Sequence, residues 1–436
     1  MHTVEPWLLI PFAVMLLTIA VAPLLTPRLW EKNTTKLLFT LAVVAPTTII
    51  LIRQDLGEAL LEQLADDYLP FITLLAALFI VTGGIRVRYN AIATPTINAV
   101  ILSIGYLLAS FIGTTGASML LIRPLLEVNH ERSHKAHTVL FFIALVANCG
   151  GILSPLGDPP LFLLYLRGVP FGWFQGLYPE WAVTGAILIF IYYVYDRYIF
   201  RHKEFIGVRP NNGDHDDHFS LSISGAANLL LLAAIIMCVA LVNESQISAI
   251  GASDAPFWLR HARELILIAL ATLSLIFTSR KLRRENNFSW GPIAEVAILF
   301  IGIFTTMTPA MIYLNENATA LHLSQPWQFY YATGALSSLL DNAPTAIAFY
   351  TVAAALPSAS TTAIVGGVTV QILKAIALGA VFFGSMSYIG NGPNFMVKSI
   401  AESEGVKMPS FFGYIFKFSL IVLLPTYIVV QLIFLA

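Results

Sequence analysis

Charged residues are scarce in this chain of 436 residues. Asp, Glu, Lys and Arg make up 11% of the sequence, whereas they make up about 25% of an average soluble domain. Hydrophobic residues account for 57%, and runs such as 7–25 and 410–436 reach the roughly 20 residues needed to cross a bilayer. This composition argues strongly against a soluble enzyme. It predicts an all-α polytopic membrane protein whose main surroundings are the lipid bilayer.

Other absences narrow the class of protein. Only two cysteines occur, Cys149 and Cys238, both inside apolar runs, so the sequence offers no disulfide framework and no metal-type spacing. No phosphate-binding loop with a Walker lysine is present, which argues against an ATP-driven pump. No nucleophile–base arrangement stands out, so we expect no enzyme activity, no cofactor and no nucleic acid partner. The N-terminus lacks a basic region before its apolar run, which predicts a retained helix rather than a cleaved signal peptide.

Two apolar stretches, 96–127 and 327–355, are too long for one span and are broken near their middles by IGTTGAS (112–118) and LDNAPTA (340–346). Each stretch could be one kinked crossing helix or a re-entrant hairpin. Two hairpins leave ten spans and place 18 of the 24 Lys and Arg residues on one face, whereas two full crossings would remove this asymmetry. Because Lys and Arg mark cytoplasmic loops, we favour hairpins, with both termini outside the cytoplasm.

The two halves of the chain then run in opposite directions. Residues 1–203 form five spans and a hairpin that opens from the cytoplasm, residues 204–219 form a cytoplasmic linker, and residues 220–436 form five spans and a hairpin that opens outward. This is the inverted repeat of secondary transporters. Aligning Ser154 with Ser387 supports it, because SPLGDPPLF (154–162) and SYIGNGPNF (387–395) then share Gly, Pro and Phe positions.

Both aligned segments interrupt an apolar run. Pro and Gly free backbone groups, which a membrane tolerates only where protein or a water-filled cavity takes them up. We therefore expect discontinuous helices at mid-membrane depth that meet the two hairpin tips around one cavity. The helix-breaking residues are Gly157, Pro159, Pro160, Gly390 and Pro393.

One acidic residue lies at a break in each half, Asp158 in the first and Asp341 in the second. Ionisable residues inside a membrane are costly and usually face a transport pathway. We predict that Na⁺ and protons compete for these two carboxylates. A structural role, in which each carboxylate caps a helix, stays open. The neutral side chains predicted to complete the site are Thr114, Thr115, Ser118, Asn148, Ser154, Asn342, Thr345, Ser387, Asn391 and Asn394.

Two further charged residues lie within apolar spans. Lys374 could pair with an acidic residue, be displaced by a transported cation, or extend to the outer interface. Glu295 could belong to a proton path or mark the interfacial start of a helix. The histidine-bearing stretches 130–137 and 214–218 fall in predicted cytoplasmic loops, so we expect both to be solvated.

Four motifs stand out along the chain: GTTGASMLLIRPLL (113–126), NCGGILSPLGDPPLF (148–162), LLDNAPTA (339–346) and YIGNGPNFMVK (388–398). They resemble those of the ion-transporter superfamily, and more narrowly its bacterial citrate-transporter-like members, usually described as sodium/proton antiporters. The resemblance implies an inner-membrane homodimer with a scaffold and a moving transport domain in each protomer. It places the site at 113–118, 154–160, 341–345 and 387–394. One departure is the first tip, where Thr114-Thr115 stands in place of the Asp-Asn common in antiporter relatives.

These observations favour a sodium/proton antiporter that works by alternating access, with Na⁺ and H⁺ as the transported ions. The alternative is a sodium-coupled symporter of citrate, a dicarboxylate or another small anion, which the Asn and Thr side chains of the tips would bind. Two acidic residues and no convincing basic residue at the breaks favour a cation. A channel-like protein or receptor is a third interpretation, which the inverted repeat disfavours.

Overall fold

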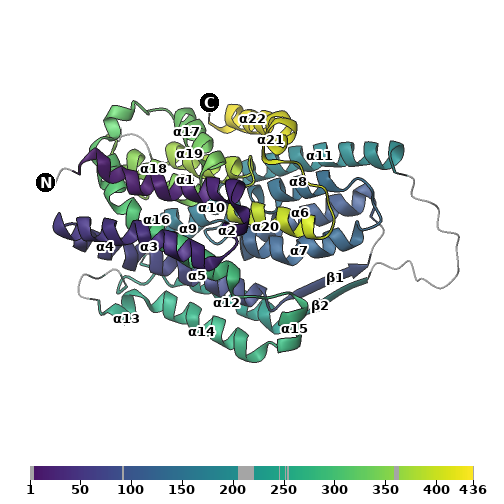
Figure 1. Cartoon of the computed structure of the whole chain (residues 1–436), viewed down its shortest axis with the longest axis horizontal. Coiled ribbons are helices and arrows are strands. Elements are labelled where there is room, and N and C mark those ends of the chain that lie inside the picture. The colour runs from purple at the N-terminus through teal and green to yellow at the C-terminus, as the bar shows by residue number, and fades with distance from the viewer. Residues whose placement is uncertain are drawn as a thin grey trace.

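The computed structural model describes residues 4–90, 93–204, 220–244, 246–250, 252, 255–357 and 363–435. This part of the chain is mostly helical, and its long helices lie roughly parallel to one another (Figure 1). Eight helical stretches are long and apolar enough to cross a membrane within the described ranges, which confirms a multi-pass membrane protein. They are Pro6–Pro23, Asn33–Arg53, Gly57–Thr82, Pro95–Ile112, Ala136–Leu153, Phe171–His202, Gly291–Glu316 and Phe411–Phe434.

The elements before residue 205 contain the first hairpin and the first helix break. In order they are η1 (Pro6–Leu9), α1 (Ile10–Leu25), α2 (Pro27–Trp30), α3 (Asn33–Arg53), α4 (Gly57–Glu62), η2 (Gln63–Tyr68), α5 (Leu69–Thr82), β1 (Arg86–Asn90), α6 (Pro95–Ile112), α7 (Thr114–Val128), α8 (Ala136–Leu145), η3 (Cys149–Leu153), α9 (Pro159–Leu166), α10 (Phe171–Gln175) and α11 (Tyr178–His202).

The elements from residue 220 onward contain the second hairpin and the second break. In order they are β2 (Ser220–Ser224), α12 (Ala226–Leu241), α13 (Phe257–Arg260), α14 (Ala262–Phe277), α15 (Arg280–Glu285), α16 (Gly291–Glu316), η4 (Ala318–Leu321), α17 (Pro326–Leu339), α18 (Asn342–Ala355), β3 (Ile364–Val365), β4 (Val368–Thr369), α19 (Val370–Gly384), α20 (Gly392–Ser403), α21 (Phe411–Tyr414), η5 (Ile415–Leu423) and α22 (Leu424–Phe434).

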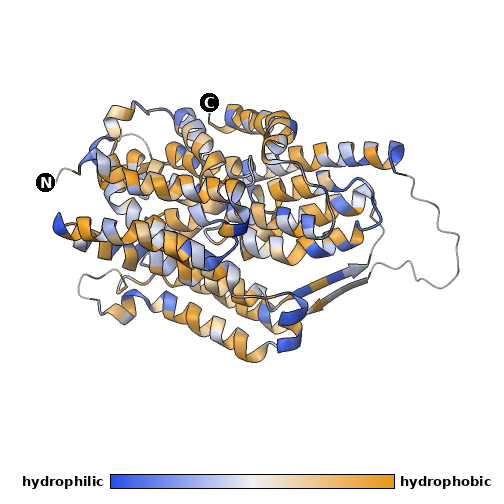
Figure 2. Cartoon of the chain, viewed as in Figure 1, coloured by the Kyte–Doolittle hydropathy of each residue, from blue (hydrophilic) through white to orange (hydrophobic). Residues whose placement is uncertain are grey.

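The helices at the periphery are hydrophobic on their outward faces (Figure 2). Leu25 on α1, Leu230 on α12 and Phe277 on α14 each expose more than two thirds of their surface. In water such a surface would be unstable, whereas in a membrane these side chains contact lipid. The most buried helices are instead those around the breaks, where α19 packs against α17 and α18, and α18 packs against α9 and α16.

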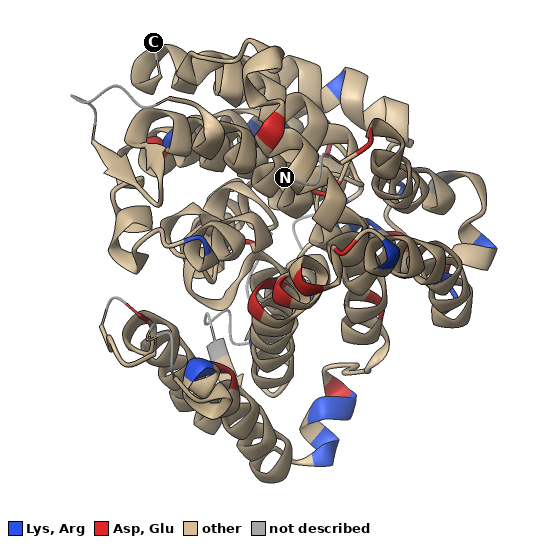
Figure 3. Cartoon of the chain, turned by 90° about the vertical axis from the view of Figure 1, so that its left-hand side faces the viewer, with Lys and Arg blue, Asp and Glu red and all other residues tan. Residues whose placement is uncertain are grey.

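Charges of opposite sign gather at opposite ends of the helices. The segment Gly57–Tyr68 carries four carboxylates, and α15 carries four basic residues. These elements lie at the left and right ends of the molecule in Figure 1. Figure 3 views the left end, almost along the helix axes, and shows acidic turns gathered near its centre. Basic residues gathered at one end are typical of membrane proteins, whose cytoplasmic loops are rich in Lys and Arg.

Each predicted hairpin is a pair of helices separated by one or two residues. Gly113 alone separates α6 from α7 and has a φ of +79°, which a residue with a side chain rarely adopts. Leu340 and Asp341, both extended, separate α17 from α18. In both cases the two helices pack side by side. The point where each helix pair turns therefore falls inside the tip that the sequence predicts.

The two discontinuous helices have matching local geometry. Asp158 and Asn391 are the residues immediately before α9 and α20, with φ and ψ of −148° and 145° for the first and −152° and 140° for the second. Upstream, the Ser154 hydroxyl accepts the Leu156 amide at 3.2 Å, and the Ser387 hydroxyl accepts the Ile389 amide at 3.2 Å. The predicted breaks are thus present, and they are alike at the level of single hydrogen bonds.

Two short antiparallel β-ribbons, which the sequence does not predict, accompany the helices in the described part of the chain. β1 pairs with β2 from Arg86 opposite Ser224 to Asn90 opposite Ser220, and β3 pairs with β4. The β1–β2 ribbon joins the loop before α6 to the residues after the predicted linker, so the two halves are also linked by strand pairing. Most of that linker, residues 205–219, lies outside the described residues, as does the histidine stretch 214–218.

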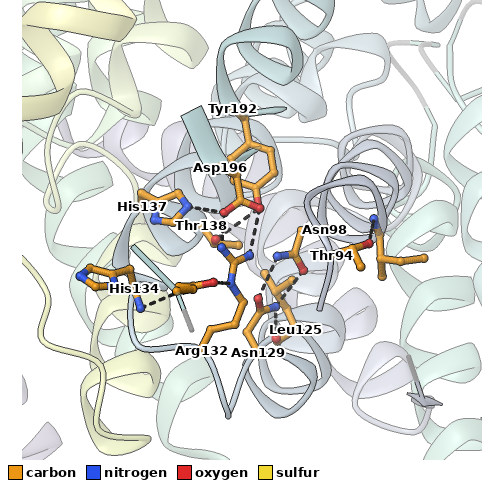
Figure 4. A network of polar contacts seen from close by, with 12 residues as sticks. Thr94, Asn98, Leu125, Asn129, Arg132, His134, His137, Thr138, Tyr192 and Asp196 are labelled. Carbon is orange, nitrogen blue, oxygen red and sulfur yellow. Dashed lines mark hydrogen bonds and ion pairs between the residues drawn. The ribbon is translucent and has the colours of Figure 1, made fainter. Parts of the chain in front are cut away.

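The stretch 130–137 is a correction, because it is not simply a solvated loop. Arg132 is buried and forms two hydrogen bonds with the Asp196 carboxylate, at 2.9 and 2.5 Å, while its Nε donates to Glu204 at 2.8 Å. His137 contacts the same Asp196 at 2.7 Å, and Figure 4 shows Arg132 and His137 pointing toward Asp196 on α11. A buried guanidinium is tolerated because both carboxylates neutralise it. This network therefore fixes the start of α8 to α11.

We predict that Gly157→Ala destabilises the protein and that Gly392→Ala does not. A Cβ on Gly157 would overlap the carbonyl oxygen of Gly151, a backbone atom that cannot move without disrupting the break, whereas a Cβ on Gly392 meets nothing. Such overpacking costs about 1–3 kcal/mol. Thermal unfolding in detergent checks this, and equal midpoints for the two variants would contradict the observed break geometry.

Candidate functional site

Asp158 lies where the two helix breaks and the two hairpin tips meet. Its Oδ1 accepts a hydrogen bond from the Thr114 hydroxyl at 2.7 Å and from the Asn391 amide at 2.9 Å, and its Oδ2 accepts the Asn342 amide at 2.6 Å. The three donors belong to the first tip, the second break and the second tip. Asp158 is 2% exposed, so the carboxylate is solvated by these donors rather than by bulk water.

A chain of asparagines continues from Asp158 through the second break. The Asn391 amide also contacts Asn148 Oδ1 at 3.1 Å, and the Asn148 amide donates to Asn394 Oδ1 at 2.7 Å. The Asn394 amide in turn donates to the free carbonyls of Gly384 at 2.8 Å and Ser387 at 2.9 Å. The backbone groups that the break exposes are thus satisfied by side chains, as burial requires.

Two buried oxygens on the hairpin tips have no hydrogen-bond partner among the described residues. They are Asn342 Oδ1 and Ser118 Oγ, both in fully buried side chains. Asn342 binds Asp158 through its amide nitrogen, so its oxygen lies next to the carboxylate. Ser118 lies one helical turn after Thr114 on α7. An unpaired buried acceptor costs about 1–3 kcal/mol, and a bound cation would remove that cost.

Asp341 has one of the two roles that the sequence leaves open, because it caps a helix. Its carboxylate accepts the Ala343 amide at 3.0 Å and so caps α18, while its carbonyl accepts the Thr345 hydroxyl at 2.8 Å. Asp341 directly precedes Asn342, whose amide binds the Asp158 carboxylate, so the two acids lie at one site. It is half-buried, whereas Asp158 is fully buried. Asp341 therefore lies at the edge of the site and Asp158 at its centre.

Several predicted residues have structural positions around this centre. The Ser154 hydroxyl donates to the Ser110 carbonyl, and Thr115 is half-buried beside a cavity of about 70 Å³ at the first tip. The prolines start the helices after the breaks, where a missing amide proton costs nothing: Pro159 and Pro160 in α9, and Pro393 in α20.

Lys374 and Glu295 form ion pairs of their own and have no described contact with the Asp158 cluster. Lys374 donates to the buried Glu180 at 2.6 Å, and Glu295, which is 40% exposed, pairs with the buried Lys36 at 2.6 Å. The pairing interpretation of Lys374 is therefore confirmed. No lysine or arginine in the described ranges bonds to Asp158 or to its three donors.

The sequence predicts Ser337 as a neutral site residue, but it does not identify Ser110 or the partners of the two ion pairs. The Ser110 hydroxyl donates to the Gly150 carbonyl, and the Ser337 hydroxyl donates to the Ala380 carbonyl at 2.6 Å, so each hairpin has a serine against a neighbouring broken helix. Both serines lie in apolar helices three or four residues before the tip. That common spacing was a usable signal. Glu180 and Lys36 gave none, because nothing near them in the sequence identifies their partners.

A protein-family model described as "Putative citrate transport" matches residues 1–435, almost the whole chain. The chain belongs to this family, CitMHS_2. Membership confirms the resemblance to citrate-transporter-like members of the ion-transporter superfamily, and it places the chain in a family of transporters rather than of enzymes. A search among curated proteins finds no match. For this CitMHS_2 protein, the cluster around Asp158 is the candidate transport site.

We predict that Lys374→Ala destabilises the CitMHS_2 protein by about 3 kcal/mol, because it leaves the Glu180 carboxylate buried and unpaired. Lys398→Ala is the matched control, since Lys398 pairs with the exposed Glu402 and such pairs contribute about 0–1 kcal/mol. Thermal unfolding in detergent measures both variants. Adding Glu180→Gln to Lys374→Ala should restore part of the loss, and a further loss in the double variant would contradict the pairing.

Proposed function

We propose that this CitMHS_2 protein is a secondary active transporter that exchanges Na⁺ for protons at Asp158. The observation that carries the proposal is the composition of the site. One buried carboxylate is surrounded by neutral hydroxyl and amide groups, and no cationic side chain is bonded to it within the described ranges. Such a site attracts a small cation and repels an anion.

The donor set suits Na⁺, which like other hard cations binds oxygen ligands. Asp158 supplies the charge, and the unpaired oxygens of Asn342 and Ser118 are free to join it. The Thr114 hydroxyl can rotate its proton away and offer a lone pair instead. A proton on Asp158 would neutralise the same carboxylate and remove its attraction for Na⁺. Competition between Na⁺ and H⁺ for one group is the simplest basis for exchange.

Alternating access requires two halves that can expose one site to either face in turn. The matched geometry of the breaks at Asp158 and Asn391 supports an inverted repeat of residues 1–203 and 220–436. The separation of acidic and basic ends supports an orientation with α15 and the β1–β2 ribbon in the cytoplasm. In this arrangement both helical pairs, α6–α7 and α17–α18, are re-entrant hairpins, and the termini lie outside. The proposed transporter is a homodimer in a bacterial inner membrane.

Sodium-coupled symport of citrate is the second candidate, and the family description favours it. In that case Na⁺ at Asp158 would supply the positive charge that an anionic substrate needs. Asn342 and Asn391 could then contact the substrate as well as the carboxylate. The two functions differ in one measurable respect, because antiport moves protons without an organic solute and symport requires one.

Purified protein in vesicles distinguishes the two functions. We expect an imposed Na⁺ gradient to drive proton movement with no organic acid present, reported by a pH-sensitive dye. Proton movement that appears only after citrate is added would favour symport and end the antiport proposal. Protein-free vesicles control for passive leak.

Two substitutions test the carboxylates in this assay. Asp158→Asn and Asp341→Asn should each reduce exchange at least tenfold while thermal unfolding stays near normal, because Asn replaces Asp with little change in volume. Asn also caps a helix as well as Asp does, so a loss at position 341 would report on charge rather than on capping. Asp66→Asn, at an exposed position in η2, is the matched control. Near-normal exchange in both site variants would remove them from the mechanism.

A further inference from the structure

A second cavity, of about 510 Å³, lies between α7, β1 and α15, well away from the Asp158 carboxylate. Arg123 on α7, Arg88 on β1 and Lys135 just before α8 line it. Arg123 lies nine residues after Thr114 on the same helix, which corresponds to about 14 Å along the axis. The cavity is therefore at the ribbon end of the molecule, on the right in Figure 1.

Three of the positive charges that line this cavity, those of Arg88, Arg123 and Lys135, form no ion pair within the described part of the chain. Neither Arg88 nor Arg123 forms a hydrogen bond or ion pair with any residue that the structure describes, although Arg123 is half-buried. The Lys135 ammonium donates only to the carbonyl of His130, at 3.0 Å, which carries no charge. A half-buried guanidinium without a counter-ion is costly, and an anion in the cavity would remove that cost.

The other large cavity, of about 760 Å³, shows the opposite pattern. Arg167 and Arg263 line it, but each is paired with a carboxylate, Asp67 for the first and Glu264 for the second. Those arginines have their counter-ions within the protein. The two cavities therefore differ, because Arg88 and Arg123 in the first have no carboxylate partner among the described residues.

Three carboxylates also line the first cavity and limit what it can bind. The charge of Glu285 is already neutralised by its ion pair with Arg86. Glu127 and Glu404 are exposed and pair with no cation in the described part of the chain. A singly charged anion would gain little against these two charges. An anion with several negative groups gains more, provided that the groups are spaced to contact separate cations.

We propose that this cavity binds a small polycarboxylate through Arg88, Arg123 and Lys135, independently of transport at Asp158. The three cations come from three different elements, which matches a ligand whose carboxylates are themselves separated. Arginine binds carboxylates in a two-pronged geometry, and the cavity volume accommodates a six-carbon tricarboxylate. Because Arg88 is on β1 and Arg123 on α7, the bound anion bridges the helix of the first tip to the ribbon.

Citrate binding to the full-length protein in detergent, measured by calorimetry at constant ionic strength and constant Na⁺, tests the proposal. Arg123→Gln and Arg88→Gln should each weaken binding at least tenfold. Glu127→Gln should strengthen it about threefold, because the repelling carboxylate one turn away is removed. Misfolding cannot produce these opposite effects. Arg28→Gln, on the exposed α2, should leave the affinity unchanged.

Asp158→Asn separates this proposal from the transport site. Unchanged citrate binding in that variant supports the cavity, whereas loss of binding there with full binding in Arg123→Gln would place citrate at Asp158 and overturn the inference. A lipid phosphate is the other source of negative charge. If citrate does not bind but phosphatidylglycerol raises the unfolding temperature in nanodiscs, and does so only when Arg123 is present, the occupant is a lipid headgroup and the polycarboxylate proposal is wrong.

Discussion

The structure depends on stabilising one buried carboxylate inside a protein surrounded by lipid. Asp158 cannot draw on bulk water, so hydrogen-bond donors must be brought to it from the chain. Regular helices have no spare donors at mid-membrane depth, because their amides are already bonded to their own carbonyls. The two helix breaks and the two hairpin tips provide the missing donors, because each brings a polar side chain to this depth. The interruptions place Thr114, Asn342 and Asn391 around the carboxylate, and Asn148 and Asn394 satisfy the backbone groups that the interruptions expose.

The second half of the chain repeats the backbone of the first but not its charge. Asn391 occupies the position before α20 that Asp158 occupies before α9, with nearly the same dihedral angles. The Asn391 amide then donates to Asp158, so the neutral residue of the second half stabilises the charged residue of the first. Two carboxylates at these positions would face each other across a buried contact and repel. The asymmetry gives one centre of charge, with Asp341 at its edge.

Local patterns predicted the breaks, because Gly and Pro in apolar runs act within a few residues. Gly113, Gly157 and Gly390 lie at the breaks that the sequence predicts. Asp158 could be predicted as a site residue because an acidic side chain at a helix break inside a membrane is costly. The partners could not be predicted in the same way. Lys374 and Glu180 are separated by 194 positions, and nothing around Glu180 distinguishes it from a helix-start carboxylate. Burial of Arg132 was missed for the same reason, since Asp196 lies on a helix 64 positions away.

The β1–β2 ribbon has a consequence for how the molecule is made. Its strands are five residues long and more than a hundred residues apart, so the first half completes its pairing only after residue 224 has left the ribosome. Until then β1 is an edge strand with unpaired amides beside the α6–α7 helix pair. Once formed, the ribbon acts as a second, non-covalent connection. A chain cut within 205–219 would still have its two fragments connected by this ribbon and by the packing of α5 against α12 and α14.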